Sequence, residues 1–142
     1  MRLWPTLDQF KDLVDRHEGV WICDTETDGL SVYGPMSRDK AWLVGLQPEG
    51  TGLVVLIDTR NPQWPYFLAL INTLTLVGHH FKFDVHAMNA KPQKAWYCTM
   101  AMVYHFSTTR RKRLDDLTHL TGKAKMPTLP QLKGPKGKQN RI

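Results

Sequence analysis

The sequence contains little cysteine and no long apolar run. Cys23 and Cys98 are too few for a disulfide framework, and the N-terminus has no signal-peptide pattern. No segment approaches the ~20 consecutive apolar residues that a membrane-spanning helix needs. These absences argue against an exported or membrane-bound protein and favour the reducing cytoplasm.

The composition is that of a folded, soluble protein with one domain. Hydrophobic residues make up 42% of the 142 residues and charged residues 23%. The net charge of +6 is unevenly spread, because residues 1–109 carry 9 Lys and Arg against 11 Asp and Glu, whereas residues 110–142 carry 10 against 2. We expect a folded domain over residues 1–122 and a basic, flexible tail rich in Pro, Gly and Lys over 123–142. The tail either binds a polyanion or only keeps the chain soluble.

The hydrophobic pattern predicts strands that alternate with helices. Short β-type runs predict five strands, over residues 20–23, 41–46, 53–57, 74–77 and 96–97. The Pro- and Gly-containing turn over 47–52 predicts a hairpin. Helical spacing predicts helices over 6–17 and 66–71, one ending near Asn89, one through Phe106, and a last one carrying Leu114, Leu117 and Leu120. This order indicates an α/β fold with a mixed five-stranded sheet and flanking helices.

Two carboxylates stand at the end of the first predicted strand. Asp24 and Glu26 are two residues apart, so both point to one face of the strand, with α-carbons ~7 Å apart. Like charges ~4 Å apart repel by ~4 kcal/mol in a partly screened setting, and a divalent cation between them would offset that cost. Carboxylate oxygens suit Mg²⁺ or Mn²⁺. The alternative is an exposed acidic turn, because Asp28-Gly29 is ordinary turn chemistry.

A third carboxylate follows the predicted strand over 74–77. The segment Gly-His-His-Phe-Lys-Phe-Asp over 78–84 places Asp84 in the first turn of a helix. If the strands over 20–23 and 74–77 are neighbours, this turn lies near Asp24 and Glu26. The alternative is that Asp84 only caps its helix, an interaction worth ~1 kcal/mol.

The two acidic segments together resemble a known family. Asp-Thr-Glu-Thr-Asp-Gly-Leu over 24–30 and Gly-His-x-x-Lys-Phe-Asp over 78–84 are similar to the first two motifs of DEDD-type (DnaQ-like) 3′–5′ exonucleases. The similarity is closest to the proofreading exonuclease domain of family A (Pol I-type) DNA polymerases, and it runs from about Trp21 to Gly122. It implies a ribonuclease H-like fold and removal of nucleoside monophosphates from a single-stranded or frayed DNA 3′ end.

The resemblance also implies roles for particular residues. Asp24, Glu26 and Asp84 would be the catalytic residues and the ligands of two Mg²⁺ or Mn²⁺ ions, which activate a water and stabilise the leaving 3′ oxygen. Leu30 matches an apolar wedge between terminal bases, and Phe83 matches an aromatic contact to the 3′ end. The other substrate-binding residues expected within the two motifs are Thr25 and His80.

The sequence departs from this family in three ways. His80 stands where the family usually has Asn, and with His79 and His86 it raises the alternative of a zinc site. The third motif, Tyr-x-x-x-Asp or His-x-x-x-x-Asp, is absent, because no Asp or Glu follows Asp116 and no Tyr follows Tyr104. The sequence also ends where the family has one or two more helices, which predicts a C-terminally truncated fold.

These departures bear on activity. Without a fourth acid the second metal ion should be held weakly. Without the general base, which typically contributes about 10²–10⁴-fold, the exonuclease should be slow or dependent on a partner. The partner would be a DNA polymerase or another chain that supplies the missing acid. The alternatives are a piece of a longer polymerase, or a catalytically impaired module that binds nucleic acid or a DNA polymerase. The compact form suggests a bacterial or phage setting.

A run of cations begins the basic region. Arg110, Arg111 and Arg113 are expected to contact DNA phosphates, each contact adding about one unit to the salt dependence of binding. The alternatives are the solvated start of a helix and a localisation-type patch without a role in binding.

Overall fold

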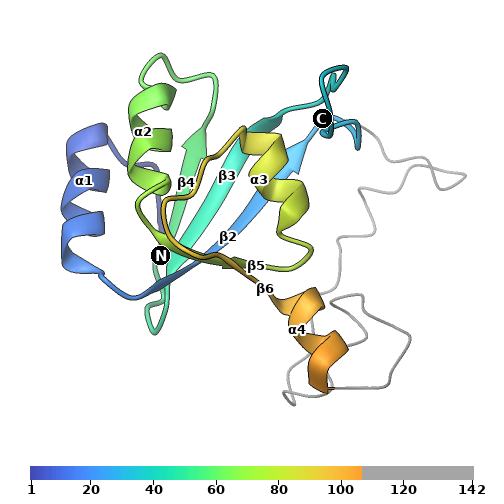
Figure 1. Ribbon diagram of the computed structural model, residues 1–142. Coiled ribbons are helices and arrows are strands. Elements are labelled where there is room, and N and C mark those ends of the chain that lie inside the picture. Colours follow the sequence, from blue (N-terminus) through green and yellow to red (C-terminus); the bar gives the residue numbers. More distant parts are fainter. Residues whose placement is uncertain (107–142) are drawn as a thin grey trace, which may run out of the picture. The chain divides into compact units, whose positions relative to one another are not determined.

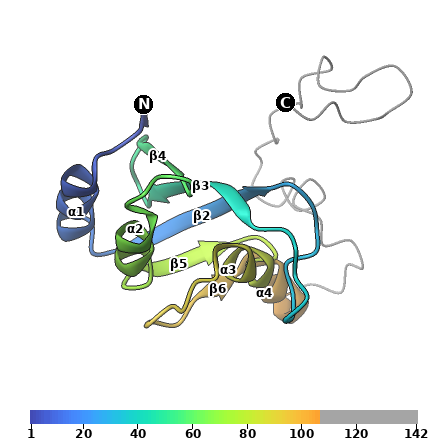
Figure 2. The same cartoon turned by 90° about the horizontal axis from the view of Figure 1, so that it is seen from above.

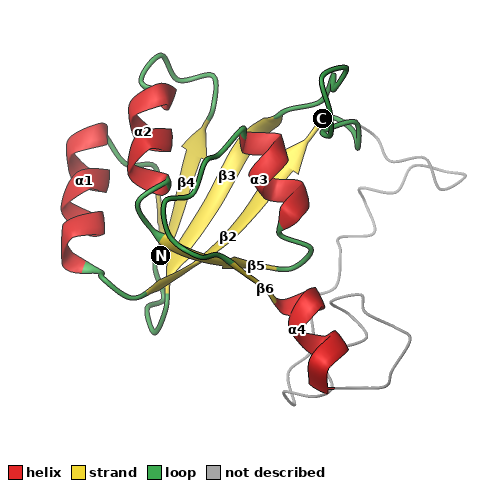
Figure 3. Ribbon diagram, viewed as in Figure 1, coloured by secondary structure: helices red, strands yellow, loops and turns green. Residues whose placement is uncertain are grey.

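The computed structural model describes residues 1–106, which form one sheet with helices packed against it (Figures 1 and 3). The strands are β1 (Arg2–Leu3), β2 (Val20–Thr27), β3 (Ala41–Pro48), β4 (Val54–Asp58), β5 (Thr75–Gly78) and β6 (Tyr97–Cys98). The helices are α1 (Leu7–Arg16), α2 (Trp64–Ile71), α3 (Lys82–Met88) and α4 (Thr99–Phe106).

The sheet is mixed and has the strand order β1-β4-β3-β2-β5-β6. Strands β2, β3 and β4 are antiparallel neighbours, which confirms the predicted hairpin. Strand β5 lies parallel to β2, so the predicted neighbours 20–23 and 74–77 do pair. The prediction of five strands is wrong, because the described residues form six. Strand β1 has only two residues, too few to show an alternating pattern, and it is recognisable only by its pairing with Val54 and Val55.

The other predicted elements agree with the structure to within a few residues. The four helices predicted before Phe106 correspond to α1 to α4, and α3 ends where Asn89 adopts the left-handed conformation. The predicted last helix, with Leu114, and the basic tail over 123–142 lie outside the described residues. None of the helices within residues 1–106 combines the length and the apolarity that crossing a bilayer requires.

The core fixes the first half of β2. Helix α1 begins with a capping box, in which Thr6 and Gln9 each accept a hydrogen bond from the other's backbone N–H. This start turns Phe10 inward, where its ring packs edge-on against Trp21, with centroids 6.1 Å apart, and against Phe67 at 5.6 Å. All three rings are buried, so the first half of β2 is held firmly in the core.

The two faces of the sheet differ. Alternate residues of the central strands point into the core that α1, α2 and α3 cover, and Figures 1 and 2 show α2 and α3 on the same face. The residues in between point to the other face. There Ile22, which is 46% exposed, lines with Leu43 and Leu56 a groove of about 270 Å³. Asp24 and Glu26 also line this groove.

Candidate functional site

The site lies where β2 and β5 separate. The two strands pair only from Val20 to Ile22, after which the chain leaves β5 at Gly78 and turns into α3. The second half of β2 therefore pairs with β3 alone. This half of β2 carries Asp24, Thr25 and Glu26, and the first turn of α3 lies beside it.

Gly78 permits this close approach. A Cβ atom at position 78 would lie 2.9 Å from the backbone oxygen of Cys23 and 2.4 Å from Cδ2 of Phe81, both closer than real Cβ contacts. The backbone oxygen belongs to β2 and cannot move away as a flexible side chain would. Only glycine fits where the two strands part.

We expect Gly78→Ala to destabilise the fold by about 1–3 kcal/mol, because the added methyl group overpacks a buried position. Thermal or urea unfolding of the variant measures this. Gly52→Ala is a matched control, since a Cβ there meets nothing within 4 Å. An unchanged midpoint in Gly78→Ala would contradict the proposed steric role.

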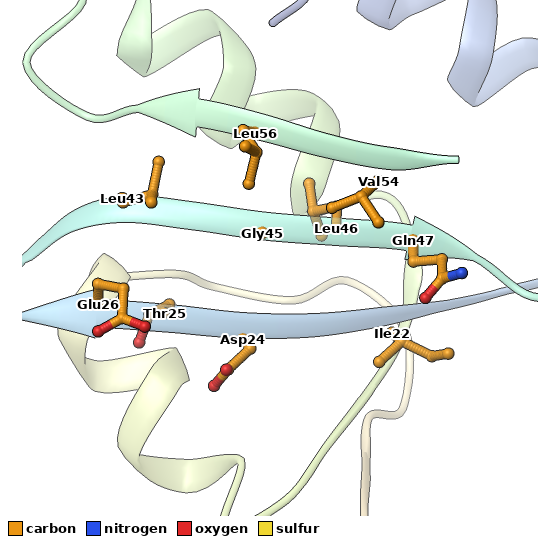
Figure 4. Close-up of a pocket in the computed structure, with 10 residues that line it drawn as sticks. All are labelled: Ile22, Asp24, Thr25, Glu26, Leu43, Gly45, Leu46, Gln47, Val54 and Leu56. Carbon is orange, nitrogen blue, oxygen red and sulfur yellow. The ribbon is translucent and has the colours of Figure 1, made fainter. Parts of the chain in front are cut away.

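Asp24 and Glu26 face the same groove, as their spacing predicts. Figure 4 shows Asp24 reaching beyond β2 on the side away from β3. The residue that pairs with Asp24 is Gly45, so no neighbouring side chain on β3 fills the space beside it. Burial, and next the charge of Asp24, raise the pKa of Glu26. The pair thus carries unfavourable like charge, as the sequence indicates.

Asp84 occupies the first turn of α3, as predicted, and is 4% exposed. Its Oδ1 accepts a hydrogen bond of 2.7 Å from the hydroxyl of Thr25. The pKa of Asp84 is raised to about 6, mainly by burial; the Thr25 hydrogen bond lowers this pKa and the charge of Asp24 raises it. Thr25 therefore orients a carboxylate, and its predicted contact with substrate stays a prediction.

Asp24 and Glu26 offer oxygen donors of the kind that a hard divalent cation prefers. The salt bridge found within residues 1–106 joins Arg60 to Asp58, so in that range no cation neutralises Asp24, Glu26 or Asp84. As the side chains lie, no group of three His, Cys, Asp or Glu in the described part of the chain is arranged to hold a metal ion. Mg²⁺, however, is commonly held by one or two carboxylates together with substrate phosphate oxygens, which Asp24 and Glu26 can provide.

Cys23 lies behind this carboxylate pair. It is 2% exposed, and burial followed by the charges of Asp84 and Asp24 raises the pKa of its thiol well above the ordinary value. A thiol that stays protonated is a poor nucleophile. Cys23 is therefore a packing residue.

The histidines do not form the zinc site that was an alternative. Nδ1 of His79 lies 2.9 Å from the hydroxyl of Thr99 and is engaged there. Since no three-ligand group occurs in residues 1–106, that part of the chain does not support the zinc alternative.

The backbone conformation of His80 suits either His or the Asn of the motif that this segment resembles. His80 has φ of 55°, in the left-handed region that Asn and His enter more readily than most other residues. The position thus selects against β-branched side chains, and His is an acceptable replacement for Asn.

We expect His80→Asn to leave stability unchanged and His80→Val to lose about 1–2 kcal/mol, because a β-branched residue is strained at positive φ. Urea unfolding of the two variants measures the difference. Equal unfolding midpoints of the two variants would contradict the conformational explanation.

Of the remaining predicted site residues, the structure describes two and leaves three outside its described range. Leu30 lies in the loop after β2 and is 82% exposed, and Phe83 is half-buried on α3. Arg110, Arg111 and Arg113 lie outside the described residues. Sequence reasoning missed that Lys82 Nζ lies 5.8 Å over the ring of Tyr33, because their 49-residue separation gives no local signal.

Comparison with known proteins relates the fold to a group of nucleases. No protein-family model and no curated protein matches the sequence. The structure resembles Brucella melitensis NrnC with bound Mg²⁺ (TM-score 0.62, 23% identity, 81% of this chain and 60% of NrnC). It also resembles RNase D of Trypanosoma brucei (TM-score 0.66, 14% identity, 89% of this chain and 49% of RNase D). A further neighbour is RNase D of Escherichia coli, an exoribonuclease involved in structured RNA processing (TM-score 0.63, 15% identity, 89% of this chain and 34% of RNase D). The chain has their ribonuclease H-like fold.

This likeness confirms the predicted fold class. The chain spans about three fifths of NrnC and half or less of the two RNase D proteins. The resemblance to DEDD-type exonucleases is therefore supported at the level of the fold. The closer resemblance to polymerase proofreading domains has no counterpart among these three neighbours and stays a prediction.

Proposed function

We propose that this chain is a metal-dependent 3′–5′ exonuclease that releases nucleoside monophosphates from single-stranded nucleic acid. The observation that carries the proposal is the carboxylate pair of Asp24 and Glu26 at the open end of β2, with Asp84 on the adjacent turn of α3. The fold that the chain shares with NrnC, which has been seen with bound Mg²⁺, supports it.

Each residue would have a distinct task. Asp24 and Glu26 would hold one divalent ion together with the scissile phosphate, and Asp84 would help to hold a second ion weakly. Such ions, when bound, activate a water and stabilise the leaving 3′ oxygen. Thr25 keeps the carboxylate of Asp84 turned toward β2 through its hydrogen bond.

Two residues that are close in sequence to the carboxylates would position the nucleic-acid strand. Leu30 exposes its side chain on the loop after β2 and would separate the terminal base from its neighbour. Phe83 directly precedes Asp84 and would contact the terminal nucleotide. Both roles come from the motif resemblance and are part of the proposal.

The substrate could be DNA or RNA, and different observations favour each. The motifs resemble those of DNA proofreading domains, which favours DNA. NrnC, in contrast, has been seen bound to pGG, and E. coli RNase D is an exoribonuclease. The arrangement of Asp24, Glu26 and Asp84 suits a phosphodiester of either kind.

The direct test incubates the purified full chain with 5′-labelled DNA and RNA strands of matched sequence, in Mg²⁺, Mn²⁺ or EDTA. We expect a ladder of strands shortened from the 3′ end in either metal and none in EDTA. A blocked 3′ end should prevent the ladder. Products that shorten from the 5′ end, or no products with either nucleic acid, would contradict the proposal.

One observation favours the alternative of a catalytically impaired module that binds nucleic acid or a polymerase. Within residues 1–106 no three potential ligands are arranged to hold a metal. A further chain that supplies an acid would restore activity, so adding a candidate polymerase to an inactive preparation separates a partner-dependent enzyme from a binding module.

A further inference from the structure

The loop between β2 and β3 places one aromatic side chain against α3. Within this loop the backbone N–H of Ser31 donates to Oδ2 of Asp39 at 2.8 Å, and the N–H groups of Arg38 and Asp39 donate to the oxygen of Ser31 at 3.0 Å. Val32 is 2% exposed and anchors the loop in the core. None of these hydrogen bonds, and none of the burial of Val32, involves the side chain of Tyr33.

Tyr33 instead contacts the helix that carries Asp84. Its ring centroid lies 4.9 Å from that of His86 and 6.3 Å from that of Phe83, in edge-on arrangements. Nζ of Lys82 lies 5.8 Å from the centre of the same ring. The charge of Asp84, after burial, raises the pKa of the Tyr33 hydroxyl, which is consistent with a position near the carboxylates.

These contacts leave part of the Tyr33 ring open. Tyr33 is 43% exposed, whereas Phe81, one turn before the carboxylate of Asp84, is fully buried. Lys82 is exposed and forms no salt bridge within residues 1–106. A partly exposed aromatic ring with an exposed ammonium group over it offers groups for the two parts of a nucleotide, a flat base and a phosphate.

We propose that Tyr33 stacks on a base of the bound strand while Lys82 binds a phosphate of the same strand. This inference rests on the proposed exonuclease function and adds a substrate-positioning pair outside the three carboxylates. Stacking on a tyrosine is tolerant of base identity, because every base has a π-face. The pair would therefore hold single-stranded ends of any sequence.

The first test measures binding apart from hydrolysis. Fluorescence anisotropy of a labelled single-stranded oligonucleotide in EDTA gives Kd without turnover, and we expect Tyr33→Ala to raise Kd about 10-fold. Tyr33→Trp should bind as tightly as the original chain. Tyr33→Leu keeps apolar contact with α3 but has no π-face, so it should bind like Tyr33→Ala, and an unchanged Tm of Tyr33→Leu excludes a folding defect as the cause.

The second test separates positioning from chemistry. In metal, Tyr33→Ala should raise KM about 10-fold and change kcat less than about twofold. Lys82→Gln should lower the salt dependence of binding by about one unit. Tyr66→Ala is the matched control, because Tyr66 is a 64% exposed tyrosine on α2.

The outcomes distinguish this inference from the proposed function. Unchanged Kd and KM in Tyr33→Ala, or a failure of Tyr33→Trp to retain binding, would overturn the inference while hydrolysis stands. Binding that depends on Tyr33 without any hydrolysis would support the inference and overturn the exonuclease function.

Discussion

Asp24→Asn is expected to lower the nuclease activity at least roughly 100-fold. The substitution keeps the shape of the side chain and takes away the charge that would hold a divalent ion. Loss of a residue that merely supports a metal ligand typically costs about 10–100-fold, so loss of a ligand should cost no less. The rate of product release from a labelled strand in Mg²⁺ measures the effect.

Metal binding gives a second measurement for the same variant. A ligand that binds the folded state raises Tm, so Mg²⁺ should raise the Tm of the original chain and leave that of Asp24→Asn unchanged. Asp12→Asn is the matched control, because Asp12 is an exposed aspartate on α1. If Asp24→Asn keeps both the activity and the Tm response, the carboxylate pair is only a structural feature of the turn.

Asp84→Asn is expected to stabilise the fold and to impair activity at the same time. The folded protein holds the carboxyl of Asp84 with a pKa of about 6, against an ordinary value of 3.8, mainly because of burial. Asn removes the buried charge, and its side-chain oxygen can still accept the hydrogen bond from Thr25. At pH 8 we expect a gain of about 1–2 kcal/mol, after allowance for solvent screening, and a rise of a few degrees in Tm.

The stabilisation by Asp84→Asn should depend on pH in a definite direction. A group whose pKa is raised in the folded state stabilises it fully below the unfolded pKa of 3.8 and loses that contribution as the pH rises through about 6. The stability difference between Asp84→Asn and the original chain should therefore grow between pH 4 and pH 7. Activity of the original chain should fall below about pH 6, because a protonated carboxyl no longer attracts a cation.

Two results would contradict this account. One is a lower Tm of Asp84→Asn at pH 8, which would mean that the charge itself stabilises the fold. The other is full activity of Asp84→Asn, which would make Asp84 a helix-capping residue, as the alternative at the sequence level had it. Asp8→Asn is the control for a first-turn aspartate elsewhere, since Asp8 stands in the first turn of α1.

The two-residue period of a β-strand determined the arrangement of the carboxylate pair. Asp24 and Glu26 share a face because alternate residues of any strand do, and this local rule needs no knowledge of the fold. The hairpin of β3 and β4 and the position of Asp84 on α3 also follow from short-range patterns of turn residues and apolar spacing. Strand β1 could not be predicted, because two residues carry no period and its partner Val54 lies 52 positions away.

What the sequence alone settled is the list of chemical groups and their local directions, since strand and helix periods act over a few residues. Only the tertiary structure decided which of these groups meet. Thr25 reaches Asp84 across 59 positions because β2 and β5 diverge at Gly78, and Tyr33 reaches α3 because its loop is tied across its base by Asp39. Such contacts depend on the packing of the whole sheet, which no short segment encodes.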